Sequence, residues 1–336
     1  MNVQRTVFLD RALAPVRRWL DDDTVVEICA NRPGEVWVEI AGGSAMQRFD
    51  VPELDRAALH YLMERVAAAS GQSVNQEHPV LSAALPTGER FQGILPPATT
   101  NGGAFAIRKQ VVKDMRLHDY RARGSFETID VGDLNALSAT DIQLCEWLDA
   151  GCIEDFIRLA VAERYSILLS GGTSSGKTTF LNAILHEVPA DERIITIEDT
   201  REVKPAQPNY LPLVASKGDQ GQARVTIESL LQAAMRLRPD RIFLGEIRGA
   251  EAYSFLRAVN TGHPGSITTI HADSPAGAIE QLALMVMQAG LGLKKLEITD
   301  YIRTVLPIVI QQTLRGCWRG TSAIYFNRMA EWRAAR

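Results

Sequence analysis

The chain has 336 residues, 46% hydrophobic and 23% charged, with a formal net charge of −4. This length and composition are typical of a folded globular protein with two or three domains and a sizeable core. The net negative charge gives no reason to expect nucleic-acid binding, and none of the four cysteines forms the C-x-x-C pair of a zinc site.

Two features predict that the chain stays in the cytoplasm. Residues 1–23 are amphipathic and interrupted by charge, so they lack the apolar core of a signal peptide. No stretch approaches 18 uninterrupted apolar residues, and the most apolar late segment, 301–312, is too short to span a bilayer. Isolated thiols also suit a reducing compartment. Docking on a membrane complex remains open.

The first 110 residues read as an α+β domain. Helical spacing predicts two helices, at 7–20 and 54–70. Strands are expected on both sides of the NRPG turn at 31–34, in a hairpin around the PTGE turn at 86–89, and at 102–110. The sequence then becomes polar and irregular, which predicts a linker over 111–140.

From residue 141 onward the pattern alternates. After two helices, short apolar strands are separated by helices of 10–15 residues, which predicts an α/β domain with a mostly parallel sheet and flanking helices over 141–336. The expected strands are YSILLS, RIITIED, RIFLGEI and GSITTIH. The expected helices include KTTFLNAILHEV, TIESLLQAAMRL, AEAYSFLRAVNT and PAGAIEQLALMVMQA.

A phosphate-binding loop lies between the first of these strands and the helix after it. Its spacing fits G-x-x-x-x-G-K-[ST], and the strand before it and helix after it supply the required context, which makes a chance match improbable. The loop amides and the helix N-terminus would bind phosphate, Lys177 would reach the β- and γ-phosphates, and the Thr178 hydroxyl would bind Mg²⁺. Nucleotide binding is expected at Gly171, Gly172, Thr173, Ser174, Ser175, Gly176, Lys177, Thr178 and Thr179.

Two later strands end in acids, as nucleotide hydrolysis requires. RIITIEDT ends in Glu198 and Asp199, and RIFLGEI ends in Glu246, with Gly245 where an aspartate often stands. The carboxyl ends of strands in an open α/β sheet line the ligand crevice. Either glutamate could instead cap the next helix. We favour Glu246 for activating water and Glu198 for the Mg²⁺ shell, although both are candidates for the metal.

Histidines and arginines complete the candidates. His271 ends a strand at the same crevice edge, where it could stabilise the γ-phosphate, or it could simply bond a loop carbonyl. His263 lies in a GHPG turn where shape could be its role. An arginine finger assists phosphoryl transfer, and Arg90 and Arg108 are available in the N-terminal region, although a lone arginine is usually a solvated surface charge.

Together these motifs resemble the VirB11 family of type IV secretion ATPases. The resemblance covers nearly the whole chain and is strongest in WLDDDTVVEICANRPGEVWVE, GGTSSGKTT, RIITIEDTRE, LRPDRIFLGEIRGAEA and TGHPGSITTIHADSP. It implies a homo-hexamer with one ring of N-terminal domains and one of RecA-like domains. ATP and Mg²⁺ would bind between the two domains of a subunit, with Arg90 and Arg108 as catalytic contacts beside Lys177, Glu198, Glu246 and His271.

The resemblance also implies a cellular role. Family members power pilus assembly and export of DNA or protein at the cytoplasmic face of the inner membrane, together with other components of the apparatus, including further ATPases. Pilus and type II secretion motors are close relatives, but the type II branch often carries a C-x-x-C element that is absent from this sequence. Other hypotheses are a nucleic-acid translocase, a nucleotide switch with little turnover and, more remotely, a small-molecule kinase.

Overall fold

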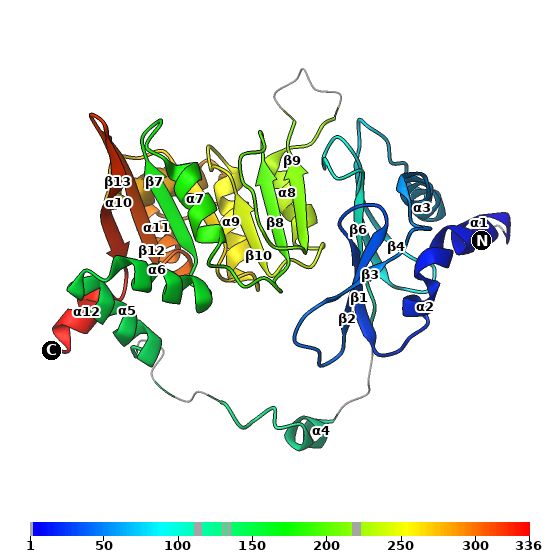
Figure 1. The fold of residues 1–336 in the computed structure, drawn as a ribbon, viewed down its shortest axis with the longest axis horizontal. Helices are drawn as coiled ribbons and strands as arrows, with labels where there is room; N and C mark the ends of the chain where they lie inside the picture. The colour runs from blue at the N-terminus through cyan, green and yellow to red at the C-terminus, as the bar shows by residue number, and fades with distance from the viewer. Residues whose placement is uncertain (1–2, 111–115, 130–131, 133–135, 217–222) are drawn as a thin grey trace.

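Two separate β-sheets organise the molecule (Figure 1). The computed structural model describes residues 3–110, 116–129, 132, 136–216 and 223–336. One sheet uses strands from the first 108 residues and the other uses strands after residue 166. Each sheet carries its own helices, so the chain is a mixed α/β protein with an N-terminal α+β unit and a C-terminal α/β unit.

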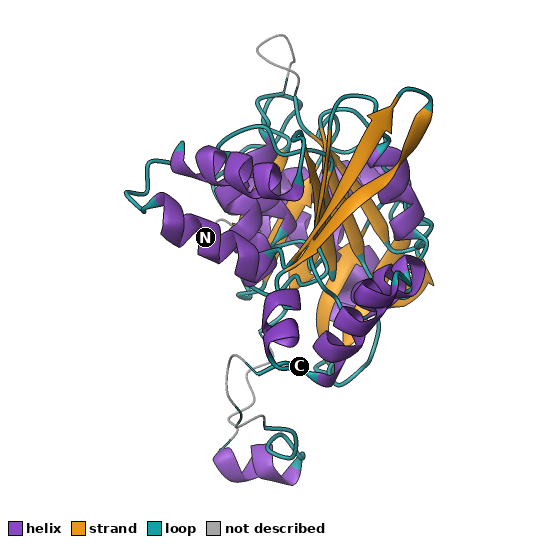
Figure 2. Cartoon of the chain, turned by 90° about the vertical axis from the view of Figure 1, so that its left-hand side faces the viewer, coloured by secondary structure: helices purple, strands orange, loops and turns teal. Residues whose placement is uncertain are grey.

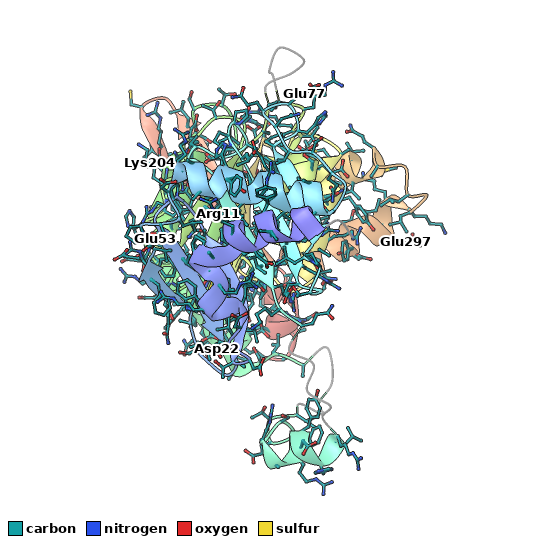
Figure 3. All side chains as sticks on the ribbon, turned by 90° about the vertical axis from the view of Figure 1, so that its right-hand side faces the viewer. Arg11, Asp22, Glu53, Glu77, Lys204 and Glu297 are labelled. Atoms are coloured by element: carbon teal, nitrogen blue, oxygen red, sulfur yellow. The ribbon has the colours of Figure 1, made fainter. Side chains whose placement is uncertain are left out.

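The N-terminal sheet is antiparallel throughout, with the order β3-β2-β1-β6-β5-β4. Its strands are β1 (Val25–Ala30), β2 (Glu35–Ile40), β3 (Gln47–Asp50), β4 (Val80–Ala84), β5 (Arg90–Ile94) and β6 (Ala104–Arg108). The NRPG and PTGE turns fall where the sequence predicts them. Helices α1 (Val3–Leu13) and α3 (Arg56–Ala69) lie side by side over one face (Figure 3, in which Arg11 is labelled).

The single helix predicted over residues 7–20 is wrong in its continuity. After α1, the chain forms a short 3-10 turn (Ala14–Val16) and then the separate helix α2 (Arg17–Leu20). Pro15 lies in the turn, and a proline lacks the N–H that a continuous helix would use and clashes with the carbonyl four residues earlier. The break therefore has a local cause in the sequence.

The C-terminal sheet has seven strands in the order β13-β12-β7-β11-β10-β8-β9. All neighbours are parallel except the hairpin β12–β13. The strands are β7 (Ile167–Gly171), β8 (Ile194–Glu198), β9 (Tyr210–Val214), β10 (Arg241–Leu244), β11 (Ile267–Ile270), β12 (Ile308–Arg315) and β13 (Trp318–Phe326). The sequence predicts four of these strands: β7, β8, β10 and β11. The predicted strand at β10 runs through Ile247, whereas β10 ends at Leu244.

Helices cover both faces of this sheet (Figure 2). Alternate strand residues enter two different cores: Leu168 and Ile242 pack in one, whereas Ile167 and Phe243 pack in the other. This alternation follows from the period of two along a strand. The covering helices are α5 (Ala139–Ala150), α6 (Ile153–Ala162) and α7 (Lys177–Leu185) on one side, and α8 (Ile227–Ala234), α9 (Glu251–Asn260), α10 (Pro275–Met287) and α11 (Lys295–Val305) on the other.

Several elements were not predicted from the sequence. They are β3, β9, the hairpin β12–β13, α11, the C-terminal helix α12 (Met329–Ala334) and the short helix α4 (Leu117–Ala122). Helix α4 falls in the segment expected to be a linker and lies apart from both sheets in Figures 1 and 2. Helix α5 begins at Ala139, two residues inside that expected linker, because Ser138 caps it by accepting from the Asp141 amide.

A buried polar cluster joins the two units. The Arg193 side chain is fully buried at the start of β8. It donates to the side-chain oxygen of Asn31 at 2.5 Å and to that of Asn209 at 2.6 Å. Asn31 is the first residue of the NRPG turn, so this turn of the N-terminal unit supplies one of the acceptors that a buried arginine of the C-terminal unit needs. None of the described helices has the length and apolar character needed to cross a membrane.

Candidate nucleotide site

The phosphate-binding loop connects the buried strand β7 to helix α7, as predicted. Two glycines are required by its geometry. A side chain on Gly171 would clash with the carbonyl oxygen of Gln312 in the neighbouring strand β12. Gly176 has a φ of +93°, in the left-handed region that favours glycine, and it immediately precedes the first helical residue. The helix N-terminus therefore opens directly onto the loop.

Lys177 is held inside this loop. Its Nζ donates to the Gly171 carbonyl at 2.7 Å and to the Gly172 carbonyl at 3.1 Å, and it lies 3.3 Å from Nδ1 of His271. Burial lowers the pKa of Lys177, although the Glu246 carboxylate opposes that shift. A phosphate group in the loop would offer this ammonium stronger, charged acceptors than the two neutral carbonyls.

His271 links the lysine to Glu246. Its Nε2 lies 3.1 Å from Glu246 Oε1, while its Nδ1 faces the Lys177 ammonium. A neutral imidazole with its proton on Nε2 satisfies both contacts, since it donates to Glu246 and accepts from Lys177. Arg248 donates to Glu246 at 2.8 Å and to Asp199 at 2.7 Å. Asp199 and Glu246 therefore each have a charged partner at this edge of the sheet.

Glu198 has a different environment. Its Oε1 accepts from the backbone amides of Glu202 at 2.8 Å and Val203 at 2.9 Å, while its buried Oε2 has no hydrogen-bond partner in the described part of the chain. Burial raises the pKa of this carboxyl, and the two amide donors oppose the shift. Neither Glu198 nor Glu246 caps a helix. The N-terminus of α9 is instead bonded by Glu251, which accepts from the amides of Arg248 and Gly249.

These groups line one cavity of about 540 Å³, which we name the P-loop cavity. The structure brings Lys177, Thr178, Glu198, Glu246 and His271 together in it. Gly171 and Gly172 do not line it, but their carbonyls hold Lys177. The lining residues are Thr173, Ser174, Ser175, Gly176, Lys177, Thr178, Thr179, Glu198, Asp199, Thr200, Glu202, Val203, Gly245, Glu246, Arg248, Thr269, His271 and Arg319.

Arg319 in this cavity was missed at the sequence level. It lies in β13, more than 140 residues after the loop, and no local motif marks it. His263 is outside the cavity, where its Nδ1 lies 2.8 Å from the Ala258 carbonyl oxygen. That contact agrees with the interpretation of the GHPG segment as a shaped turn.

Arg90 and Arg108 are not brought to the P-loop cavity. They face each other in the register of β5 and β6 and line a second cavity of about 610 Å³, which we name the arginine cavity. Neither side chain has an ion pair or hydrogen bond with the described residues of this chain. The arginine cavity is lined by Glu27, Gln72, Ser82, Ala83, Ala84, Arg90, Phe91, Gln92, Arg108, Met235, Arg236 and Arg238.

A model of the family described as "Type II/IV secretion system protein" matches residues 10–329. The type IV secretion system protein VirB11 of Bartonella henselae is 36% identical over 93% of this chain and 91% of its own length. VirB11 of Brucella suis is 40% identical over 85% and 80%, respectively. PtlH of Bordetella pertussis, also a type IV secretion system protein, is 39% identical over 84% and 83%.

A solved structure gives the same result. The VirB11 ATPase of the Brucella suis type IV secretion system, crystallised in complex with sulphate, superimposes with a TM-score of 0.89 at 36% identity. The match covers 97% of this chain and 99% of that one. The site geometry agrees with this likeness, since one cavity brings together a P-loop with its strand and helix, two acidic strand ends and a histidine. The chain therefore belongs to the type II/IV secretion system protein family, in its VirB11 group, and is a nucleotide-binding ATPase.

Proposed function

We propose that this chain is the ATP-hydrolysing motor of a type IV secretion or conjugation apparatus. The observation that carries the proposal is the convergence of Lys177, Glu246 and His271, with Glu198, on one cavity at the ends of parallel strands. The relatives are named for type IV secretion systems. In this role the enzyme works at the cytoplasmic face of the inner membrane and powers pilus assembly and the export of DNA or protein.

The phosphate contacts follow from the loop. Residues 171–179 bind the phosphates of ATP through backbone amides and the N-terminus of α7. Lys177 exchanges its two carbonyl acceptors for phosphate oxygens. The imidazole of His271 then keeps its hydrogen bond to Glu246 and faces the γ-phosphate side of the site.

The residues present fit a Mg²⁺ ion. The unpartnered buried Oε2 of Glu198, the half-buried Thr178 hydroxyl and the Glu246 carboxylate all line the P-loop cavity. No cluster of three or more His, Cys, Asp or Glu side chains suited to a metal was found among the described residues. This agrees with Mg²⁺, which usually takes one or two carboxylates and completes its shell with phosphate oxygens and water. The ion would neutralise charge on the phosphates.

Glu246 is the proposed base for the attacking water. Arg248 and His271 fix its two oxygens, at 2.8 Å and 3.1 Å respectively, so its position is set before substrate binds. Glu198 has one oxygen committed to loop amides, which suits a fixed role beside the metal better than proton transfer. We therefore assign water activation to Glu246 and the metal shell to Glu198; any part of Glu246 in holding the ion would be through water.

We further propose that Arg90 and Arg108 act on the nucleotide of a neighbouring copy in a homo-hexameric ring. Both are exposed, form no ion pair with the described residues and lie outside their own P-loop cavity. Directly opposed like charges on paired strands are unfavourable unless an anion lies near them. The N-terminal unit (1–110) and the ATPase unit from residue 139 would form the two domains of this ring, joined by the segment between them.

Turnover and binding together test the assignment. Wild-type protein is expected to hydrolyse ATP in the presence of Mg²⁺, whereas Glu246→Gln is expected to bind ATP with nearly unchanged affinity and turn it over far more slowly. Unchanged turnover in Glu246→Gln would remove Glu246 from the mechanism. ATP binding without turnover in the wild-type hexamer would favour the nucleotide-switch hypothesis. Tight, salt-sensitive binding of single-stranded DNA would favour the translocase hypothesis.

A further inference from the structure

One residue of the P-loop cavity comes from the opposite flank of the sheet. Glu246 follows β10, Glu198 ends β8 and His271 follows β11. In the strand order β13-β12-β7-β11-β10-β8-β9, all three of these strands lie on the same side of β7, the strand that leads into the loop. Arg319 lies on β13, on the other side of β7, and it is the only lining residue from that side among the described residues.

The hairpin β12–β13 is fixed against the loop. Strand β12 pairs with β7 from Ile308 opposite Ile167 through Gln312 opposite Gly171. The chain then continues for three more residues, turns at Gly316, which has a φ of +60°, and returns with Arg319 opposite Leu314. Arg319 therefore lies past the level of Gly171, beside the loop itself. Figure 1 shows the hairpin extending alongside β7 at the edge of the sheet.

The close fit at Gly171 makes this placement rigid. A Cβ at that position would meet the Gln312 carbonyl, so the hairpin backbone lies directly against the first residue of the loop. The Gln312 side chain also donates to Thr321 Oγ1 at 2.7 Å, across the hairpin. The base of the hairpin is thus held by backbone pairing, tight packing and a side-chain bond, all of which position Arg319.

The Arg319 guanidinium is available to a ligand. Arg248, the other arginine of the cavity, is paired with Asp199 and Glu246. Arg319 is exposed and has no ion pair or hydrogen bond with the described residues. Leu314, directly opposite in the strand register and so on the same face of the hairpin, is 39% exposed. A cation beside an apolar side chain suits a planar ring better than it suits a phosphate alone.

The direction of the nucleotide follows from these positions. With Glu246 as the proposed base for water, the γ-phosphate lies beside Glu246 and His271, and the rest of the nucleotide extends from the loop toward the β12–β13 side. We infer, resting on that proposed function, that Arg319 is a nucleotide-binding residue that contacts the base and ribose of ATP and not its phosphates. The hairpin would then hold a part of the ligand that is the same in ATP and ADP.

The experiment compares three ligands: ATP, ADP and inorganic tripolyphosphate, which lacks the base and ribose. Arg319→Ala is expected to raise the Kd of ATP and of ADP by the same factor, about tenfold, the loss expected for one partly desolvated cation–ring contact. The Kd of tripolyphosphate is expected to change less than twofold. Turnover at saturating ATP should stay within about a factor of two, because the contact is the same in the ground state and the transition state.

The matched control is Arg315→Ala. Arg315 lies on the same hairpin, is exposed and faces the opposite side, across from Trp318, so its loss should leave all three affinities unchanged. A loss of ATP affinity without a loss of ADP affinity, or an equal loss for tripolyphosphate, would move Arg319 to the phosphates and overturn the inference. Unchanged nucleotide affinity in Arg319→Ala would also overturn it. Wild-type turnover and Lys177→Ala, measured in parallel, report separately on the ATPase assignment.

Discussion

The P-loop cavity and the arginine cavity are similar in size, but their charges are arranged in opposite ways. In the first, Lys177, His271, Glu246, Arg248 and Asp199 are connected by contacts of 2.7–3.3 Å. In the second, Arg90, Arg108 and Arg236 have no ion pair among the described residues, and only Arg238 is paired, with Glu39 and Asp240.

This difference separates a site whose charges are preorganised by contacts within one chain from a cavity in which three of the four arginines form no ion pair with the described residues. Connected charges hold catalytic groups in place before substrate arrives, which is the main way enzymes stabilise developing charge. Unpaired arginines instead provide affinity for an anion that another molecule supplies. The comparison therefore predicts that substitutions in the P-loop cavity strongly reduce turnover in the subunit that carries them. Turnover lost through substitution of Arg90 or Arg108 should be restored by a second copy of the chain.

The largest effect is expected for Lys177→Ala. Loss of the ammonium removes the phosphate contact and leaves Nδ1 of His271 without its Lys177 partner, so turnover should fall by at least about 10³-fold, to background. Steady-state ATPase assays measure it. Lys204→Ala is the control, because Lys204 is exposed and outside the cavity. Retention of turnover in Lys177→Ala would show that the P-loop cavity is not the site of hydrolysis.

Glu246→Gln should be next, with turnover reduced by about 10²–10³-fold, the usual contribution of a general base. ATP affinity should change little, since the amide keeps the shape and one acceptor of the carboxylate. Glu198→Gln is the informative comparison. If it reduces turnover equally but shifts the Mg²⁺ dependence, the two glutamates have the separate roles proposed. If only Glu198→Gln slows turnover, the assignment of the base must be reversed.

Arg90→Ala and Arg108→Ala should each reduce turnover by about 10–100-fold, the loss of one hydrogen bond to a charged group. The decisive measurement mixes Arg108→Ala subunits, which are impaired, with Lys177→Ala subunits, which are expected to be inactive. Recovery of activity in the mixture means that an arginine of one copy acts on the P-loop of another. Equal loss with no recovery would place both functions in one chain. Arg121→Ala, at an exposed site in α4, controls for the loss of surface charge.

The smallest effect concerns Glu27 in the arginine cavity. Burial raises its pKa to about 7, although Arg108, Arg193 and Arg238 lower it, while Glu39 acts with burial to raise it. The folded state thus keeps a proton that the unfolded chain, in which the carboxyl has its ordinary pKa near 4.5, releases at lower pH. The free energy of unfolding should therefore decrease as pH rises from about 4.5 to about 7 and then level off.

Glu27→Gln should remove that decrease. Relative to wild type, it is expected to gain about 1–2 kcal/mol at pH 8 and little at pH 5, less than the full shift implies because the cavity admits water. Urea denaturation at both pH values measures the difference. An unchanged pH slope in the variant would mean that Glu27 is ionised in the folded protein and paired with the arginines of this cavity.

Much of the P-loop cavity is predictable from the sequence because its groups occupy fixed positions relative to strand ends. Lys177 follows Gly176 at the start of a helix, and Glu198, Glu246 and His271 each end or follow a buried parallel strand. Parallel strands place their carboxyl ends at one edge, so local pattern was sufficient. The break at Pro15 also has a local cause, because a proline outweighs helical spacing where the two disagree.

Contacts between residues that are far apart in the sequence could not be predicted from local sequence patterns. The motifs that predict nucleotide contacts at Arg90 and Arg108 do not specify which P-loop those residues approach, and the tertiary structure places them at a separate cavity. Arg319 illustrates the converse: no motif marks it, yet the crossover that puts β12 beside β7 brings it to the loop. By itself, the sequence determined the chemistry of the loop and strand ends, because that chemistry depends on neighbours along the chain. Which arginines line the P-loop cavity depends on the tertiary structure, because strand order and the packing of the two units depend on contacts between residues far apart in the chain.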